Sequence, residues 1–320
     1  MKDWKSWGIK ARVFKDNNYH AIWGNLKTIR LGKGVATELP PDKSEFYDVG
    51  INTMCNAECP FCYVSASHKG VNYPGICETW KNWMDTFTEQ DSSTTSTLKA
   101  IPNHKGIILT DKPFQIAIGS TGEPTIHPDF CKFLETVYNT NVVPNYTTNG
   151  ITIAKDDELS KQILEATRKF VGGVAVSFGN KSLRPYAEKA IDKLIAEGDT
   201  NINIHHIISD KESVDEFVRV WEKYGDNILY HVLLPLMPSG RSTEGIGEGV
   251  FEYLEEKIKE RNIKNIAFGA HFVEYLKHSD IKTYLYEPES FSKNIILTKN
   301  KVQITPSSFN LKPILTIKIL

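Results

Sequence analysis

Three cysteines lie within eight residues of one another near position 60, in the segment NTMCNAECPFCY of residues 52–63. Thiolates are soft ligands that suit iron–sulfur clusters or zinc. A [4Fe–4S] cluster normally takes four protein sulfurs, so three thiolates leave one iron open to bind a small molecule directly. Cys55, Cys59 and Cys62 therefore predict a metal centre with an open coordination position.

A closed zinc site is the alternative for the same segment. Such a site takes four ligands, and His68, six residues after Cys62, could supply the fourth. Zinc-binding sequences usually carry two C-x2-C pairs, whereas this segment has one. The loop by itself does not decide between an iron–sulfur cluster and a zinc ion.

The elements that must position this loop follow from the hydrophobic pattern. Short apolar runs rich in β-branched and aromatic residues alternate with stretches of helical spacing, which predicts a parallel sheet with right-handed crossovers. Trp80, Trp83, Met84 and Phe87, for example, share one helical face. The expected strands are EFYDVGIN, PFQIAIGS, VVPNYTTNG, VGGVAVSFG, NINIHHIIS and ILYHVLLPL. The other expected helices cover 128–139, 157–170, 182–197, 209–225 and 249–261.

Six strand–helix units predict an α/β fold, a partial (βα)6 parallel barrel with short β-rich extensions at both ends. The expected divisions are an N-terminal extension of residues 1–44, a core barrel of 45–241 and a C-terminal extension of 242–320. We expect a turn at residues 16–18, a polar insertion over 88–113 and a turn at Lys299-Asn300. A parallel barrel carries its chemistry at the carboxyl ends of its strands.

Polar residues stand on or just after the expected strands. On the fifth strand, alternation puts Asn203 and His205 on one face, which indicates the lining of a pocket because buried polar groups need partners. Arg241 follows the sixth strand and either grips a carboxylate or lies on the surface. Four further residues complete the set. Gly122 and Glu123 follow the second expected strand, Asn149 is at the end of the third, and Ser177 is near the end of the fourth.

The cysteine loop resembles that of radical S-adenosylmethionine (radical SAM) enzymes, which have C-x3-C-x2-C with an aromatic residue, here Phe61, before the last cysteine. The segment GSTGEP of residues 119–124 is similar to the family's glycine–glutamate motif, with Thr121 in place of the usual first glycine. The resemblance covers roughly residues 45–241 and implies a [4Fe–4S] cluster on Cys55, Cys59 and Cys62.

The resemblance also implies that S-adenosylmethionine binds the open iron and is cleaved reductively to a 5′-deoxyadenosyl radical, which abstracts hydrogen from a substrate. An external electron donor of the flavodoxin or ferredoxin type is expected. The residues implied in cofactor binding are Phe61, Gly122, Glu123, Asn149, Ser177, Asn203 and His205, and the candidates for a catalytic role are His205 and Arg241.

The substrate is less well defined by the sequence. The C-terminal extension resembles the SPASM or twitch type of peptide-maturing relatives but lacks cysteines for an auxiliary cluster, since only Cys77 and Cys131 lie outside the loop. This resemblance favours a peptide or protein side chain, or else a small molecule. A net charge of −1 does not favour nucleic acid. RNA or nucleoside modification and a zinc-binding module without activity stay as alternatives, and the class of reaction stays open.

The expected location is the cytoplasm. The N-terminus has no apolar signal region, and no run of 18 apolar residues predicts a membrane span. Five cysteines, an odd number, favour thiolate chemistry over a disulfide framework.

Overall fold

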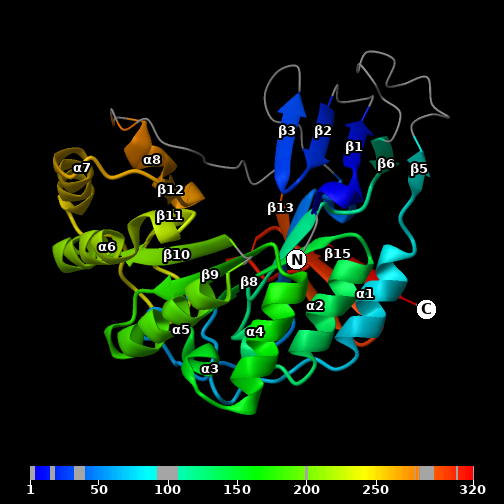
Figure 1. The fold of residues 1–320 in the computed structure, drawn as a ribbon, viewed down its shortest axis with the longest axis horizontal. Coiled ribbons are helices and arrows are strands. Elements are labelled where there is room, and N and C mark those ends of the chain that lie inside the picture. Colours follow the sequence, from blue (N-terminus) through cyan, green and yellow to red (C-terminus); the bar gives the residue numbers. More distant parts are fainter. Residues whose placement is uncertain are drawn as a thin grey trace.

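The computed structural model describes residues 4–14, 19–31, 40–91, 107–198, 201–277, 279, 281, 292–307 and 309–319. Within these ranges the chain forms one ten-stranded and one five-stranded sheet, with helices packed against the larger (Figure 1). The six expected strands are neighbours in the larger sheet and run parallel. They are β4 (Phe46–Gly50), β7 (Gln115–Ile118), β8 (Val143–Thr148), β9 (Gly173–Phe178), β10 (Asn201–Ile208) and β11 (Tyr230–Pro235).

The predicted α/β class with a parallel sheet is therefore confirmed, while its closure into a partial barrel stays a prediction. Two further strands lie beside the six: β12 (Ile266–Phe268) pairs with β11, and β13 (Ser292–Thr298) pairs with β4, both parallel. Antiparallel strands β14 (Lys301–Thr305) and β15 (Leu315–Lys318) follow β13. The turn expected at Lys299-Asn300 joins β13 to β14. The C-terminal strands thus continue the core sheet, and the predicted division into domains stays a prediction.

Helices cover one face of the large sheet, as α1, α2, α4 and α5 show in Figure 1. Alternation along each strand sends every second side chain toward these helices, so Tyr47, Ile116, Tyr146 and Ile204 are buried in the main core. The long helices are α1 (Ile76–Met84), α2 (Phe130–Asn139), α4 (Glu158–Phe170), α5 (Arg184–Glu197), α6 (Lys211–Tyr224) and α7 (Val250–Glu260). The short ones are α3 (Ile151–Ala154), α8 (Val273–Leu276) and single 3-10 turns at 4–7, 41–43, 124–126, 181–183, 225–227 and 270–272.

The helix starts follow from capping side chains. Asp157 accepts a hydrogen bond from Ser160 N at the start of α4. Asp210 and Ser213 form a capping box at the start of α6, where the side chain of each accepts from the backbone of the other. None of the helices in the described ranges has the length and apolar composition needed to cross a membrane.

The smaller sheet combines the N-terminal strands with part of the expected polar insertion. Its order is β3 (Lys27–Leu31), β2 (Tyr19–Gly24), β1 (Ile9–Phe14), β6 (Ile107–Thr110) and β5 (Glu89–Asp91). The polar insertion expected over 88–113 has a strand near each end, because β5 pairs with β6 and the apolar run of β6 pairs with β1. Residues 92–106 and the turn expected at 16–18 lie outside the described residues.

Candidate functional site

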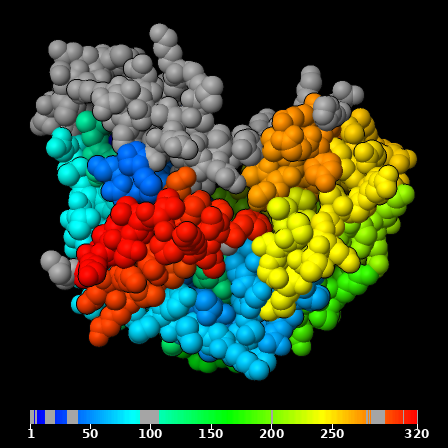
Figure 2. Space-filling model, turned by 180° about the vertical axis from the view of Figure 1, so that it is seen from behind, coloured from blue at the N-terminus to red at the C-terminus, as the bar shows by residue number. Residues whose placement is uncertain are grey.

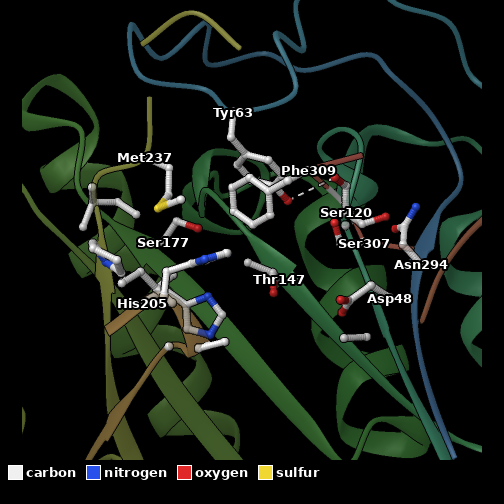
Figure 3. Close-up of a pocket in the computed structure, with 18 of the residues that line it drawn as sticks. Asp48, Tyr63, Ser120, Thr147, Ser177, His205, Met237, Asn294, Ser307 and Phe309 are labelled. Atoms are coloured by element: carbon white, nitrogen blue, oxygen red, sulfur yellow. Dashed lines mark hydrogen bonds between the residues drawn. The ribbon is translucent and has the colours of Figure 1, made fainter. Parts of the chain in front are cut away.

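A cavity of about 440 Å³ lies on the face of the large sheet opposite the helices. The strand residues that point away from the main core line it, among them Asp48, Thr147, Ser177 and His205 (Figure 3). Residues that follow β11, together with Phe309 near the C-terminus, supply a more apolar wall. The cavity thus lies along the carboxyl-terminal halves of the parallel strands, where α/β proteins usually bind ligands.

The cysteine loop joins β4 to α1 at the edge of this cavity. Cys55, Cys59 and Cys62 lie on the loop, and the side chains of Phe61 and Tyr63 border the cavity directly. Backbone hydrogen bonds fold the loop on itself, from Cys55 N to Ser67 O at 2.9 Å and from Cys62 N to Cys59 O at 3.2 Å. The loop therefore holds three thiols beside a space large enough for a small molecule.

Two asparagine amides point at cysteine sulfurs from neighbouring strand ends. Asn149, after β8, lies with Nδ2 3.8 Å from Cys55 Sγ, and Asn180, after β9, donates from Nδ2 to Cys59 Sγ at 3.3 Å. Asn149 also donates to Asn56 Oδ1 at 2.8 Å, which ties it to the loop. Amide donors to sulfur stabilise a thiolate and tune the potential of an iron–sulfur cluster. Sequence reasoning selected Asn149 but missed Asn180, although the latter follows a strand end directly.

Arg241 fixes the same loop from the segment after β11. Its guanidinium donates from Nε to Cys59 O at 2.8 Å and from Nη1 to Ala66 O at 2.9 Å. Gly240 adopts a left-handed backbone, with φ of 64°, and a Cβ there would lie 2.2 Å from Cys62 O. Arg241 therefore holds the loop in place. Its Nη2 has no partner among the described residues, and its grip on a substrate carboxylate stays a prediction.

The surroundings of two of the thiols disfavour their thiolate forms. Burial is the main cause that raises the pKa of Cys55 to about 11, and nearby Glu123, Cys59 and Cys62 contribute smaller increases. Burial also raises the pKa of Cys59, while the hydrogen bond from Asn180 lowers it. A metal must therefore displace protons when it binds, which is the ordinary coupling between metal binding and thiol deprotonation.

The donor set fits a cluster by its chemistry, with three soft thiols and no carboxylate among the candidate ligands. Within the described ranges, no group of three or more His, Cys, Asp and Glu side chains converges to hold a single metal ion. A [4Fe–4S] cluster takes each thiolate on a different iron, so its ligands are spread apart. His68, the possible fourth zinc ligand, is exposed and contacts Glu58 Oε1 at 2.5 Å through Nδ1.

Glu123 is buried behind the cavity wall and is already saturated with hydrogen-bond donors. Its Oε1 accepts from Thr125 Oγ1 at 2.6 Å and Thr148 Oγ1 at 2.8 Å, and its Oε2 accepts from Asn149 N at 2.8 Å. Burial nevertheless raises the pKa of Glu123, because desolvation outweighs these bonds. The carboxylate thus links the turns after β7 and β8, and its expected contact with a cofactor amine stays a prediction.

Gly122 is needed for contact between two loops. A Cβ at this position would lie 2.6 Å from both Asn52 Oδ1 and Met54 O, so a side chain would push the turn after β7 away from the cysteine loop. The residues of this turn that line the cavity are Gly119 and Ser120. They come three residues before the expected pair, Gly122 and Glu123.

Of three polar residues that were predicted to line the pocket, two border the cavity and one does not. Ser177 and His205 border the cavity together, and they are register partners on neighbouring strands. Burial lowers the pKa of His205 to about 4, so its imidazole is neutral at physiological pH. Asn203 lies nearer the amino end of β10 and outside the cavity lining, where its Oδ1 accepts from Tyr230 N at 3.1 Å.

Aromatic and polar contacts close the cavity mouth around Tyr63. Its ring packs on Phe309 with centroids 4.6 Å apart, its hydroxyl donates to Ser120 O at 3.1 Å, and its carbonyl accepts from Ser239 Oγ at 3.3 Å. In Figure 2 the C-terminal residues, in red, lie side by side with yellow residues of the segment after β11. Segments distant in sequence therefore meet at this mouth.

Cys77 and Cys131 lie away from the loop. Both are partly buried and pack against the main hydrophobic core, from α1 and α2 respectively. Burial raises the pKa of each thiol, as expected for cysteines that act as small apolar residues.

Comparison with protein-family profiles and with curated proteins gives no match. Solved structures do match. Streptococcus suis SuiB bound to S-adenosylmethionine aligns with a TM-score of 0.57 at 14% identity over 83% of this chain. SuiB bound to its precursor peptide SuiA aligns with a TM-score of 0.57 at 15% identity over 84%. The chain spans about 60% of the length of SuiB in both alignments.

A radical SAM methyltransferase from Sphaerobacter thermophilus aligns with a TM-score of 0.48 at 13% identity, over 80% of this chain and 75% of that one. The two SuiB alignments, with TM-scores of 0.57, establish the fold and nothing beyond it. The chain therefore has the fold of radical SAM enzymes, and the resemblance inferred from the cysteine loop is confirmed at that level.

Proposed function

We propose that this chain is a radical SAM enzyme that holds a [4Fe–4S] cluster on Cys55, Cys59 and Cys62 and binds S-adenosylmethionine in the adjoining cavity. The observation that carries the proposal is the position of the three thiols, on a loop at the carboxyl edge of a parallel sheet and beside a cavity of about 440 Å³. Amide donors aimed at two of the sulfurs, from Asn149 and Asn180, support it.

When bound, the cluster and S-adenosylmethionine together supply reductive cleavage and a 5′-deoxyadenosyl radical for hydrogen abstraction. The chain's own residues hold, orient and shield the reactants. Arg241 keeps the loop folded, and Ser177 and His205 present polar groups to the cavity. His205 stays neutral because burial lowers its pKa to about 4, so it can donate from one ring nitrogen and accept at the other. The wall of Leu234, Leu236, Met237 and Phe309 excludes water.

The proposed substrate is a peptide or protein side chain. SuiB, whose fold this chain shares, has been solved with its precursor peptide bound. Ser307 and Phe309, which lie between β14 and β15, line the cavity, so this C-terminal segment takes part in the space that a substrate would enter. The proposed electron donor is an external flavodoxin or ferredoxin.

The test is anaerobic reconstitution of the full-length chain with iron and sulfide. We expect about four irons and four sulfides per chain, the brown colour of a cluster, and conversion of S-adenosylmethionine to methionine and 5′-deoxyadenosine under reduction. In the Cys59→Ala variant we expect cleavage to fall to the background rate while the thermal unfolding midpoint changes little. Cys131→Ala is the matched control, since it removes a thiol of similar exposure and should retain cleavage.

Two outcomes would overturn the proposal. One is a protein that retains about one zinc and takes up no iron or sulfide. The other is a Cys59→Ala variant that unfolds with its metal content, because a purely structural site couples metal binding to folding.

A further inference from the structure

The cavity has a carboxylate on its wall for which the described part of the chain offers no partner. Asp48 lies in the middle of β4, on the face turned away from the helices, where it is half-buried and lines the cavity. Burial alone raises its pKa to about 7, with no contribution from a cationic neighbour or a hydrogen-bond donor. A buried carboxylate without a partner is costly, so its presence on a cavity wall points to a ligand.

Asn294 stands next to Asp48 and presents a second unused acceptor. The two residues are register partners on the parallel strands β13 and β4, so their side chains share the cavity face. Asn294 is 1% exposed, and among the described residues its Oδ1 has no hydrogen-bond partner.

The orientation of this amide is fixed by Thr305. Asn294 Nδ2 donates to Thr305 Oγ1 at 2.8 Å, and the Thr305 hydroxyl in turn donates to the carbonyl of Ser307 at 3.1 Å. Because the hydroxyl hydrogen is used in that second bond, Thr305 can only accept from Asn294. The amide nitrogen is therefore occupied, and the free atom of Asn294 is an acceptor.

Ser120 adds a third group on the same side. It follows β7, the strand next to β4, and its buried Oγ also lacks a partner among the described residues. Figure 3 shows Asp48, Asn294 and Ser120 on one side of the cavity, across from His205 and Ser177. Three adjacent strands thus bring a carboxylate, an amide oxygen and a hydroxyl to one patch of wall.

The other titratable groups on the cavity wall are Tyr63, His205, His271 and Lys293. Lys293 is the one lysine or arginine among the described residues of the wall, and it is already engaged in an interaction of its own. Since that interaction leaves no trace on the pKa of Asp48, the carboxylate is not neutralised from within the described chain.

We infer that Asp48, Asn294 and Ser120 form a subsite for a protonated primary amine of the substrate. A primary ammonium has three donors and one positive charge, which match three acceptors of which one is anionic. The inference rests on the proposed function in that it assigns the substrate of the same cavity: a molecule that carries an ammonium near the position to be modified. The lysine side chain of a peptide and a free alkylamine are the two sources of this group.

The test is calorimetric titration of n-butylammonium into the anaerobically purified full-length chain at pH 8, with 1-butanol as the neutral probe of equal size. We expect saturable binding of the amine and none of the alcohol. Asp48→Asn should weaken amine binding by about 10- to 100-fold, the loss of one charge-assisted hydrogen bond. Ser120→Ala should weaken it by about 3- to 10-fold. The control Asp85→Asn removes an exposed carboxylate and should leave binding unchanged.

Equal binding of the amine and the alcohol, or equal amine affinity in Asp48→Asn and the parent, would overturn the inference. A thermal melt of each variant establishes that it is folded. A second pair of probes separates the sources: acetyl-Gly-Lys-Gly-amide and the same tripeptide with norleucine. Tighter binding of the lysine peptide than of n-butylammonium assigns the ammonium to a peptide, and equal binding assigns it to a small amine.

The two proposals fail separately, because amine binding is measured without cofactor turnover. If the amine does not bind while the reconstituted parent still cleaves S-adenosylmethionine, the proposed subsite alone is contradicted. If no cluster forms but the amine binds saturably and depends on Asp48, the radical chemistry is contradicted and the amine-binding cavity is supported.

Discussion

The two faces of strand β10 carry adjacent histidines with opposite surroundings. His206 points toward α6, where its Nε2 lies 3.0 Å from His231 Nδ1 and its ring packs on Phe217 at 5.1 Å between centroids. His205 points into the cavity, and burial is the sole influence on its pKa. The same residue type on the same strand thus has a hydrogen-bond partner on one face, whereas on the other face the described residues supply none.

The same contrast recurs on β4 between Tyr47 and Asp48. The hydroxyl of Tyr47, on the helix face, accepts from Ser44 N and donates to Pro41 O, both at 3.1 Å. The carboxyl of Asp48, on the cavity face, has no such partner among the described residues. Tyr47 and His206 are thus hydrogen-bonded on the helix face, although the Nε2 atom of His231 has no partner there among the described residues. Stability and function therefore divide between the two faces of one sheet.

The largest expected effect is the difference in unfolding free energy between variants of His206 and His205. His206→Ala should lower the free energy of unfolding by about 3 kcal/mol, because it opens a cavity in a packed region and orphans His231 Nδ1. His205→Ala should lower it by less than about 1 kcal/mol, since that side chain borders an existing cavity. Urea denaturation of both variants measures the difference, and similar losses would break the contrast between the faces.

The pH dependence of stability sharpens the same contrast. Burial lowers the pKa of His231 to about 4 and that of His206 well below its ordinary value. In the unfolded chain both titrate near 6.5, so the unfolded state takes up protons first as the pH falls. Stability should therefore be full above pH 6.5 and decline toward pH 4, by about 3 kcal/mol from His231 alone.

The doubly substituted chain His206→Gln and His231→Gln isolates this pair. His205 titrates with the same sign and is present in both proteins, so the difference between their pH profiles belongs to the helix face. Urea midpoints from pH 7.5 to 4.5 measure it. Profiles of equal steepness would show that the buried pair does not titrate as its surroundings predict.

The smallest expected effect is a gain in stability, on replacement of Asp48. Asp48→Asn should raise the free energy of unfolding by about 1–2 kcal/mol at pH 8, because it removes a charge without a partner among the described residues. This is less than the roughly 4 kcal/mol that the full pKa shift corresponds to, since the side chain is half-buried on a cavity wall, where solvent screens the charge. The pKa of Asp48 is raised to about 7 in the folded chain from 3.8 in the unfolded chain, so the charge destabilises fully above pH 7 and not at all below about pH 4. The gain should shrink accordingly in melts at pH 8, 6 and 4. A loss of stability at pH 8 would show that Asp48 has a structural partner.

Local patterns in the sequence determined a large part of this protein. Apolar runs and helical spacing identified the six parallel strands and the long helices, because both follow from neighbouring residues. The spacing of Cys55, Cys59 and Cys62 indicated a metal centre, and the parallel α/β sheet expected around it is present, while its closure into a partial barrel stays a prediction. Asp48 carried a readable signal as a lone charge inside an apolar strand, and sequence reasoning passed over it.

Tertiary structure alone decided which distant residues meet. Asn294 lies beside Asp48 because β13 pairs with β4 across most of the chain, and Asn180 reaches Cys59 from another strand end. Glu123 also hydrogen-bonds Thr148, and Arg241 also hydrogen-bonds the cysteine loop, whereas their contacts with ligands stay predictions. Strand pairing of this kind depends on packing between segments far apart in sequence, and a local pattern contains no record of it.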